Sequence, residues 1–220
     1  GSEMCIRDRT EGGSMTDIYV YNQLTKDNNG NIKVDQNGNL GITSSNTPVK
    51  VGNLDADFNL GWTNHFTYKG IDLGIVLSAR VGGLAYSATQ GILDYYGVSE
   101  TSATARDNGG IPINNGKVNA QKYYQTIGTG EGGYGRYYLY SATNVRLQEL
   151  SLNYTLPKRW FKNVANVTLG IVGRNLWMIY CKAPFDPELS ASTSSNYYMN
   201  VDYFMQPSLR NFGFNVKVQF

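Results

Sequence analysis

The sequence predicts an all-β protein built of long antiparallel strands, and three observations support this fold class. Several runs alternate apolar and polar residues with a period of two, the pattern of a strand with one apolar and one polar face. Charged residues make up only 16% of the 220 residues, whereas 17 tyrosines and 25 glycines are present. The connections between the alternating runs are short and long in turn.

The first residues differ from the rest of the chain. They begin with GSEMCIRDR, which lacks the apolar core of a signal peptide and is typical of translated adapter sequence. We therefore expect a non-native leader at 1–16 and one structural region at 17–220, with a disordered polar leader as the alternative. The two cysteines, Cys5 and Cys181, are too few for a disulfide framework.

The stretch DNNGNIKVDQNGN, residues 27–39, contains two Asn-Gly pairs. Such pairs are typical of tight hairpin turns, so we expect two turns here. Asp and Asn also alternate from Asp27 onward, as in a calcium-binding loop, but Ile32 stands where an EF-hand needs glycine. No cofactor or metal is therefore expected, and calcium bound to this loop is the minor alternative.

The first strands form a hairpin with long arms. Residues 58–69 read FNLGWTNHFTYK and residues 71–81 read IDLGIVLSARV, with a turn at Lys69-Gly70 between them. Each arm has about the 9–11 residues that a tilted strand needs to cross a bilayer.

Two further strands follow after a long connection. The third lies in NVRLQELSLNYTLP and changes the parity of its apolar residues between Leu147 and Leu150, which predicts a β-bulge. Pro157 ends it, and a basic turn leads to the fourth strand, NVTLGIVGRNLWMIY. No run shows both helix caps and a sustained 3.6-residue pattern, so no helix is expected.

The last run, FGFNVKVQF, predicts a fifth strand that ends on an aromatic residue. Its apolar face carries Phe212, Phe214, Val216, Val218 and Phe220.

The lengths of the connections predict a membrane topology. Residues 69–70 and 157–164 are short connections, whereas 82–136 and 182–208 are long. Outer-membrane barrels have short periplasmic turns and long extracellular loops. We therefore expect transmembrane strands with both long loops and residues 17–57 outside. A soluble extracellular β-sandwich, which binds carbohydrate or acts as an adhesin, is the alternative.

No group of residues predicts catalysis, so an enzyme is not expected. His65, the one histidine, falls on the polar parity of its strand, and no catalytic triad or metal cluster can be assembled from it. Asp186 and Glu188 in FDPE lie beside prolines and predict a turn rather than an acid–base pair across a cleft. The net charge of +2 gives no indication of nucleic-acid binding.

Four motifs carry a resemblance to a known family. NVRLQELSLNYTLPKRWF, GIVGRNLW, FDPE and a final strand ending in Phe occur in this order. They resemble the C-terminal part of SusC/RagA-type TonB-dependent transporters, and the resemblance extends back to about Asp17. It implies a 22-stranded transmembrane β-barrel in the outer membrane of a Gram-negative bacterium. This chain would hold about the last five strands, as an open curved sheet with long extracellular loops.

The resemblance also implies a function and partners. Such transporters import oligosaccharides or peptides with a SusD-like lipoprotein, and TonB acts on a plug domain that this chain lacks. The barrel strands contact membrane lipid. The final strand, with Phe212, Phe214, Val216, Val218 and Phe220, is the signal for the barrel-assembly machinery.

The tyrosines are the candidate contact residues. Some lie near strand ends, as in an interfacial aromatic belt. Others lie in the predicted outer loops, where their rings would stack on sugars or pack against the lipoprotein; packing within the loops is the alternative. These loop tyrosines are Tyr123, Tyr124, Tyr134, Tyr197 and Tyr198.

Overall fold

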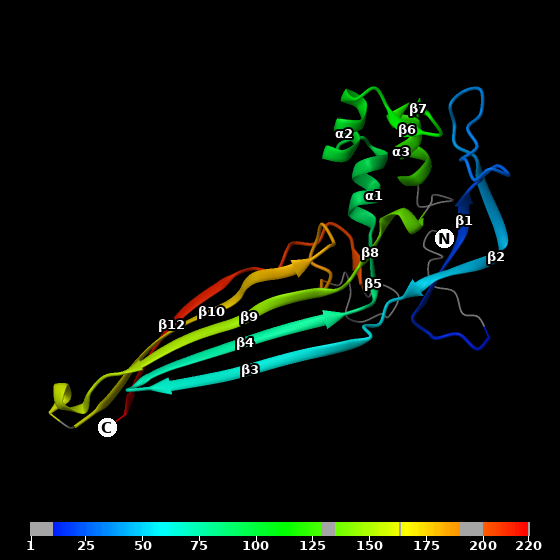
Figure 1. Cartoon of the computed structure of the whole chain (residues 1–220). Helices are drawn as coiled ribbons and strands as arrows, with labels where there is room; N and C mark the ends of the chain where they lie inside the picture. Colours follow the sequence, from blue (N-terminus) through cyan, green and yellow to red (C-terminus); the bar gives the residue numbers. More distant parts are fainter. Residues whose placement is uncertain (1–10, 129–134, 163, 190–199, 220) are drawn as a thin grey trace. The chain divides into compact units, whose positions relative to one another are not determined.

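The structure is a computed structural model that describes residues 11–128, 135–162, 164–189 and 200–219. The chain divides into two compact units. The loop unit comprises Gly1–Asp55, Gly83–Tyr140 and Ser190–Met205, and the sheet unit comprises Ala56–Gly82, Ser141–Leu189 and Gln206–Phe220. Each unit is thus assembled from three stretches of the chain (Figure 1).

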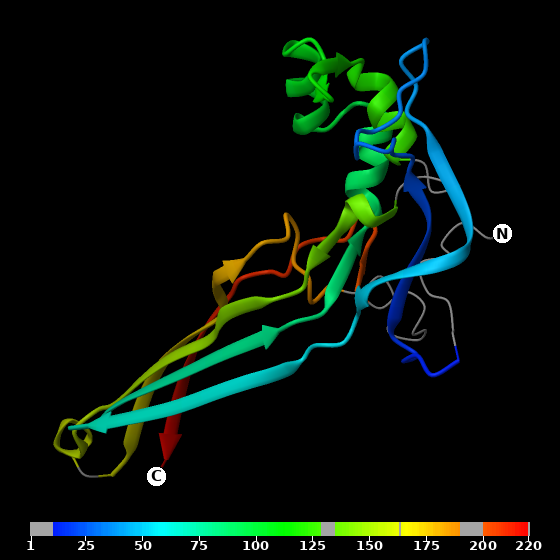
Figure 2. The ribbon, with the colours of Figure 1, turned by 45° about the vertical axis from the view of Figure 1, so that its right-hand side comes forward.

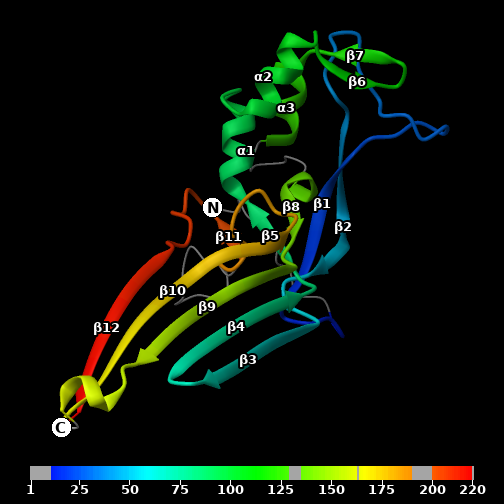
Figure 3. The ribbon, with the colours of Figure 1, turned by 60° about the vertical axis from the view of Figure 1, so that its left-hand side comes forward.

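The sheet unit is a single antiparallel sheet of five strands. Its spatial order is β12-β10-β9-β4-β3, so each strand pairs with its neighbour along this series (Figure 3). The sheet is open, with β3 and β12 at its two edges. All five predicted strands are confirmed: β3 (Phe58–Tyr68), β4 (Ile71–Val81), β9 (Asn144–Thr155), β10 (Asn166–Cys181) and β12 (Asn211–Gln219).

The turn between β3 and β4 has the geometry expected of a two-residue hairpin. Lys69 and Gly70 have φ angles of 47° and 88°, and type I′ turns require positive φ at both central residues. A Cβ atom at Gly70 would lie 2.9 Å from the carbonyl oxygen of Thr155. Glycine is therefore needed here for its conformation and for the close approach of β9.

The predicted β-bulge in β9 is confirmed. Val76 of β4 pairs with Glu149, whereas the next residue, Leu77, pairs with Leu147. Gln148 is the extra residue of the bulge. Because of it, the apolar residues before and after Gln148 fall on opposite parities of the sequence. After β9, Pro157 and the 3₁₀ turn η2 (Lys158–Phe161) lead into β10.

The loop unit begins with a hairpin of β1 (Asp17–Leu24) and β2 (Ile42–Asn53). Between these strands, both predicted Asn-Gly turns are confirmed. Gly30 and Gly38 each donate a backbone hydrogen bond of 3.0 Å, to the carbonyl oxygens of Asp27 and Asp35 respectively. Each Asp carboxylate also accepts backbone N–H groups of its own turn, so these side chains stabilise the turns directly.

The expectation that the chain contains no helix is wrong. Three short helices lie between β4 and β9 (Figure 2). Ser87 caps α1 by accepting the N–H of Gln90 at 3.1 Å, and Ser99 caps α2 by accepting the N–H of Ser102 at 3.1 Å. The elements of this region are β5 (Leu84–Ser87), α1 (Ala88–Tyr95), α2 (Glu100–Asp107), β6 (Ile111–Ile113), β7 (Gly116–Val118), α3 (Ala120–Gly128), η1 (Gly135–Tyr138) and β8 (Leu139–Ser141).

The core of the loop unit lies around α3. Ile127 and Tyr138 are each only 1% exposed and pack with residues from α2, β7 and the segment before β2. A short strand from the second long loop, β11 (Val201–Asp202), pairs in parallel with β5. Among the described residues, no helix combines the length and apolar character needed to cross a membrane.

Candidate functional site

The sheet unit has one broad apolar surface, called here the apolar face. One row of directly paired residues runs across all five strands and illustrates it: Phe66, Leu73, Leu152, Ile171 and Phe214. Phe214 is 82% exposed, and most large apolar side chains on these strands are also exposed. An exposed apolar surface of this extent marks contact with a membrane or a protein. A β-sandwich would instead cover this face with a second sheet.

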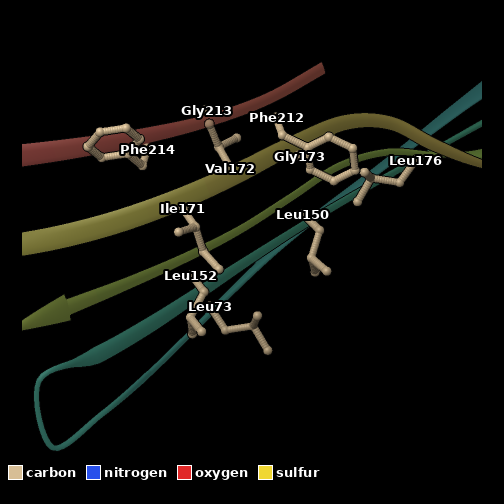
Figure 4. Close-up of a pocket in the computed structure, with 10 residues that line it drawn as sticks. All are labelled: Leu73, Leu150, Leu152, Ile171, Val172, Gly173, Leu176, Phe212, Gly213 and Phe214. Carbon is tan, nitrogen blue, oxygen red and sulfur yellow. The ribbon is translucent and has the colours of Figure 1, made fainter. Parts of the chain in front are cut away.

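A groove of about 480 Å³ lies on the apolar face (Figure 4). Gly173 pairs with Leu150 on one side and Phe212 on the other, and the side chain of Leu176 lies over it, 2.7 Å from where a Cβ atom of residue 173 would be. Every residue that lines the groove is apolar or glycine. The groove therefore suits hydrocarbon and offers no side-chain hydrogen bond to an aqueous ligand.

The opposite face of the sheet is polar, as the alternation predicts. On this face, Arg174 Nε donates a hydrogen bond to Glu149 Oε2 at 2.8 Å. His65 lies close to Gly74, because a Cβ atom at Gly74 would be 3.1 Å from the imidazole Cε1 of His65. Within the described part of the chain, no three His, Cys, Asp or Glu side chains are placed to hold a metal ion. This face fits a water-filled lumen.

The FDPE motif forms a turn, as predicted, and the turn is fixed by an ion pair with β9. Arg146 Nη2 lies 2.7 Å from Asp186 Oδ1, and Arg146 Nη1 donates to Asp186 Oδ2 at 3.3 Å. Both side chains are nearly buried, 5% and 9% exposed. Burial would raise the pKa of Asp186, but hydrogen bonds from Arg146, Ser208 and the backbone of Glu188 outweigh it and lower the pKa.

This ion pair holds both ends of the second long loop. Asp186 lies at the beginning of that loop, and Ser208, near its end, donates a hydrogen bond to the same carboxylate. Arg146 is held in place by Asn144, which accepts its Nε–H at 3.2 Å. This pair was not predicted from the sequence. The sequence did contain a signal for it: Arg146 lies within a predicted transmembrane strand, and a charged side chain in such a strand requires a partner.

The predicted contact residues Tyr123 and Tyr124 are buried in the loop unit. They are 6% and 7% exposed, and their rings pack edge to face at 5.3 Å. Tyr123 also packs against Tyr137, with 6.0 Å between ring centroids. This arrangement fits packing within the loop, the alternative that the sequence left open. Tyr134, Tyr197, Tyr198 and Phe220 lie outside the described residues.

A buried carboxylate connects the helices. Asp94 of α1 is 3% exposed and accepts hydrogen bonds from Gln90 at 2.9 Å, Thr101 at 3.1 Å, Tyr138 at 3.0 Å and Ser99. Burial, together with the Asp94 charge, raises the pKa of Tyr138 far above its ordinary value, so this hydroxyl stays protonated and continues to donate. The network fixes α1, α2 and η1 relative to one another.

A cavity of about 440 Å³, called here the helix cavity, lies beside this network. Its walls come from the end of α1, from α2 and from the first half of α3. The volume lies within the range of small-molecule sites. Its lining mixes aromatic, amide and charged side chains: Asp94, Tyr95, Tyr96, Ser102, Arg106, Gln121, Tyr124 and Gln125, with Gly97 and Ala120.

Comparison by sequence finds one informative relative. No family model matches the chain. The chain is 26% identical over 217 residues to TonB-dependent receptor P3 of Formosa agariphila. The alignment covers 96% of this chain but 21% of the relative, so the chain spans about one fifth of the length of the curated relative it matches.

Comparison by structure finds solved chains with a similar fold. The fold matches the RagAB peptide importer in its "closed-closed" state with a TM-score of 0.55 and 18% identity, over 92% of this chain and 22% of that one. It matches the "open-open" state with a TM-score of 0.58 and 16% identity, over 93% and 22% of the two chains. These matches show a shared fold.

The two comparisons agree with the amphipathic sheet. The sequence relative is named as a receptor and the structural neighbour as a peptide importer, so both comparisons point to receptors and transporters. The chain is thus similar in sequence to part of a TonB-dependent receptor, and it shares its fold with part of the RagAB peptide importer.

Proposed function

We propose that this chain forms part of a transporter that imports oligosaccharides or peptides across the outer membrane, with a SusD-like lipoprotein and with energy delivered through TonB. The observation that carries the proposal is the five-stranded sheet with one apolar and one polar face. Its strands have 9 to 16 residues, enough for tilted strands to cross the hydrocarbon core.

Connectivity supports an orientation for the sheet. The Lys69-Gly70 turn and the 3₁₀ turn η2 join strands at one end of the sheet. All three stretches of the loop unit leave from the other end, at Phe58, between Val81 and Asn144, and between Cys181 and Asn211. Short turns face the periplasm in outer-membrane barrels, so the loop unit is the external part.

The composition of the loop unit supports a partner protein at the outer side. Tyr203 and Phe204 are 57% and 54% exposed, although aromatic side chains of this size are usually buried. Exposed aromatic residues are enriched in the centres of protein interfaces. A lipoprotein that closes over the loop unit would cover them.

The proposal is tested by nutrient uptake in the bacterium that carries the receptor. Strains that lack the receptor gene, or lack TonB, are grown on single polysaccharides and on a peptide digest as the only nutrient. The proposal predicts that both deletions abolish growth on the same nutrient and that the complete receptor gene restores it. Growth of the receptor mutant at the wild-type rate on every nutrient would contradict the proposal.

A further inference from the structure

The helix cavity lies within the loop unit, and the β-barrel architecture does not require such a cavity. We infer that it binds one uncharged sugar residue of a glycan chain. The inference rests on the proposed function, because it assigns a class of cargo to the loop unit. It goes beyond that function in naming the site and the side chains that recognise the ligand.

The floor of the helix cavity is rigid. Asp94, Ser102 and Tyr124 are 3%, 1% and 7% exposed. Ser102 donates to the backbone oxygen of Ser99 at 2.9 Å, and Asp94 is held by the four hydrogen bonds described above. A preorganised floor lowers the entropy that binding costs.

Close packing of two helices fixes the walls. A Cβ atom at Gly128 of α3 would lie 2.8 Å from the carbonyl oxygen of Gly91 and 3.1 Å from the Cβ atom of Tyr95, so α1 and α3 touch there. The cavity is lined by the other half of α3, from Ala120 to Gln125. On the α2 side, Arg106 Nη1 donates a hydrogen bond to the carbonyl oxygen of Gly97 at 2.6 Å. This bond connects α2 to the segment that follows α1.

The rim offers hydrogen bonds of both kinds. Gln121 and Gln125 are one helical turn apart on α3, so they share a face, and both line the cavity. Both are exposed, and neither side-chain amide bonds to any residue that the structure describes. An amide both donates and accepts, which matches the hydroxyl groups around a sugar ring. The exposed ring of Tyr96 adds a flat, half-apolar surface for the face of the sugar.

The charges of the lining favour an uncharged ligand. The carboxylate of Asp94 is occupied by four donors, and the guanidinium of Arg106 is already bonded to Gly97. The two charges are of opposite sign, so the lining carries no net charge.

The test measures ligand binding to the complete receptor in detergent by titration calorimetry. The probes are cellohexaose, maltohexaose and mannohexaose as neutral glycans, hexagalacturonate as an acidic glycan, and hexa-alanine as a peptide. We expect at least one neutral probe to bind. Tyr96→Ala and the double variant Gln121→Ala/Gln125→Ala should each weaken its Kd at least tenfold. Gln36→Ala, which changes an exposed glutamine outside the cavity, should change the Kd less than twofold.

Each variant is first confirmed to reach the outer membrane at the wild-type level. The inference is overturned if no neutral probe binds, or if the cavity variants bind as the wild type does. It is also overturned if the receptor binds hexa-alanine or hexagalacturonate and the cavity variants weaken the binding of that probe. None of these outcomes contradicts the proposed transport function. A different result would contradict the proposed function alone. In that case the receptor binds a neutral glycan through the cavity, but cells take up no cargo through the receptor.

Discussion

At the scale of single residues, Arg146 and Asp186 form a bidentate and nearly buried ion pair in the sheet unit. The guanidinium faces both oxygens of the carboxylate, and Glu188 Oε2 lies 3.4 Å from Arg146 Nη2. Removing one member of a buried pair leaves the other charge without compensation, which costs about 3–5 kcal/mol. The pair therefore holds the second long loop at the end of β9.

Arg146→Met tests this role. We expect the variant to loosen the loop base by about 3–5 kcal/mol, because Asp186 would lose its bidentate partner. Hydrogen exchange of residues 182–189 in the complete receptor measures the effect. The matched control is Arg174→Met, which breaks the more exposed pair with Glu149 and should cost about 0–1 kcal/mol. Equal protection of residues 182–189 in Arg146→Met and in the control would show that the pair does not anchor the loop.

The same pair predicts a dependence on pH. The pKa of Asp186 is lowered in the folded state, whereas an unfolded Asp has a pKa of about 3.9. Above about pH 4, the ionised carboxylate thus contributes its full stabilisation to the folded state. This stabilisation is lost as the pH falls through the lowered folded-state pKa of Asp186. The difference in thermal stability between the wild type and Asp186→Asn should be constant at neutral pH and shrink below about pH 4. A difference that stays constant throughout the acid range would contradict the assignment.

At the scale of elements, β12 carries the amphipathic pattern to the edge of the sheet. Phe214 lies on the apolar face opposite Ile171, whereas Lys217 lies on the polar face opposite Thr168. Arginine at mid-membrane on a lipid-facing position costs about 2–4 kcal/mol, whereas lumen positions tolerate polar exchange. Phe214→Arg should therefore reduce the amount of receptor in the outer membrane far more than Lys217→Gln. Equal amounts of the two variants, measured in isolated outer membranes, would mean that the two faces are assigned wrongly.

The terminal segment gives a related expectation for assembly. We propose that the apolar face of β12, from Phe212 to Val218, is recognised by the barrel-assembly machinery together with Phe220. Deleting Phe220 should then lower the amount of receptor in the outer membrane. The matched control is Gln219→Ala, which changes the adjacent position on the polar face. Wild-type amounts after the deletion would remove Phe220 from the assembly signal.

The strands could be predicted from the sequence because their alternation depends on local pattern alone. Even the bulge at Gln148 was visible as a change of parity between Leu147 and Leu150. The helices were missed because each has only eight or nine residues, too few for a sustained 3.6-residue pattern. Their capping serines were the available signal: Ser87, followed three residues later by Gln90, is a capping box in sequence terms.

The candidate site could be predicted only in part. The sequence identified residues 82–136 as a long connection but predicted none of the helices within it, and it could not distinguish a buried tyrosine from an exposed one. Tyr123 and Tyr124 are buried because they lie on the core side of α3, whereas Tyr96 follows the end of α1 and is exposed. The helix cavity depends on contacts among three helices, and no local pattern encodes such contacts.

At the scale of the whole molecule, the central claim is that the five strands span the outer membrane with the loop unit outside. The claim follows from connectivity, because the two short turns share one end of the sheet and all stretches of the loop unit leave from the other. It also follows from the uncovered apolar face, which is stable only in contact with hydrocarbon or another protein.

Cysteine labelling of the complete receptor on intact cells tests this claim most directly. Cys181 is first changed to serine, and single cysteines are introduced at Glu100 in α2 or at Lys158 in η2, both exposed positions. A membrane-impermeant maleimide should label the Glu100→Cys variant on whole cells. It should label the Lys158→Cys variant only after the outer membrane is permeabilised. Labelling of Lys158→Cys on whole cells, with Glu100→Cys protected until permeabilisation, would contradict the proposed topology.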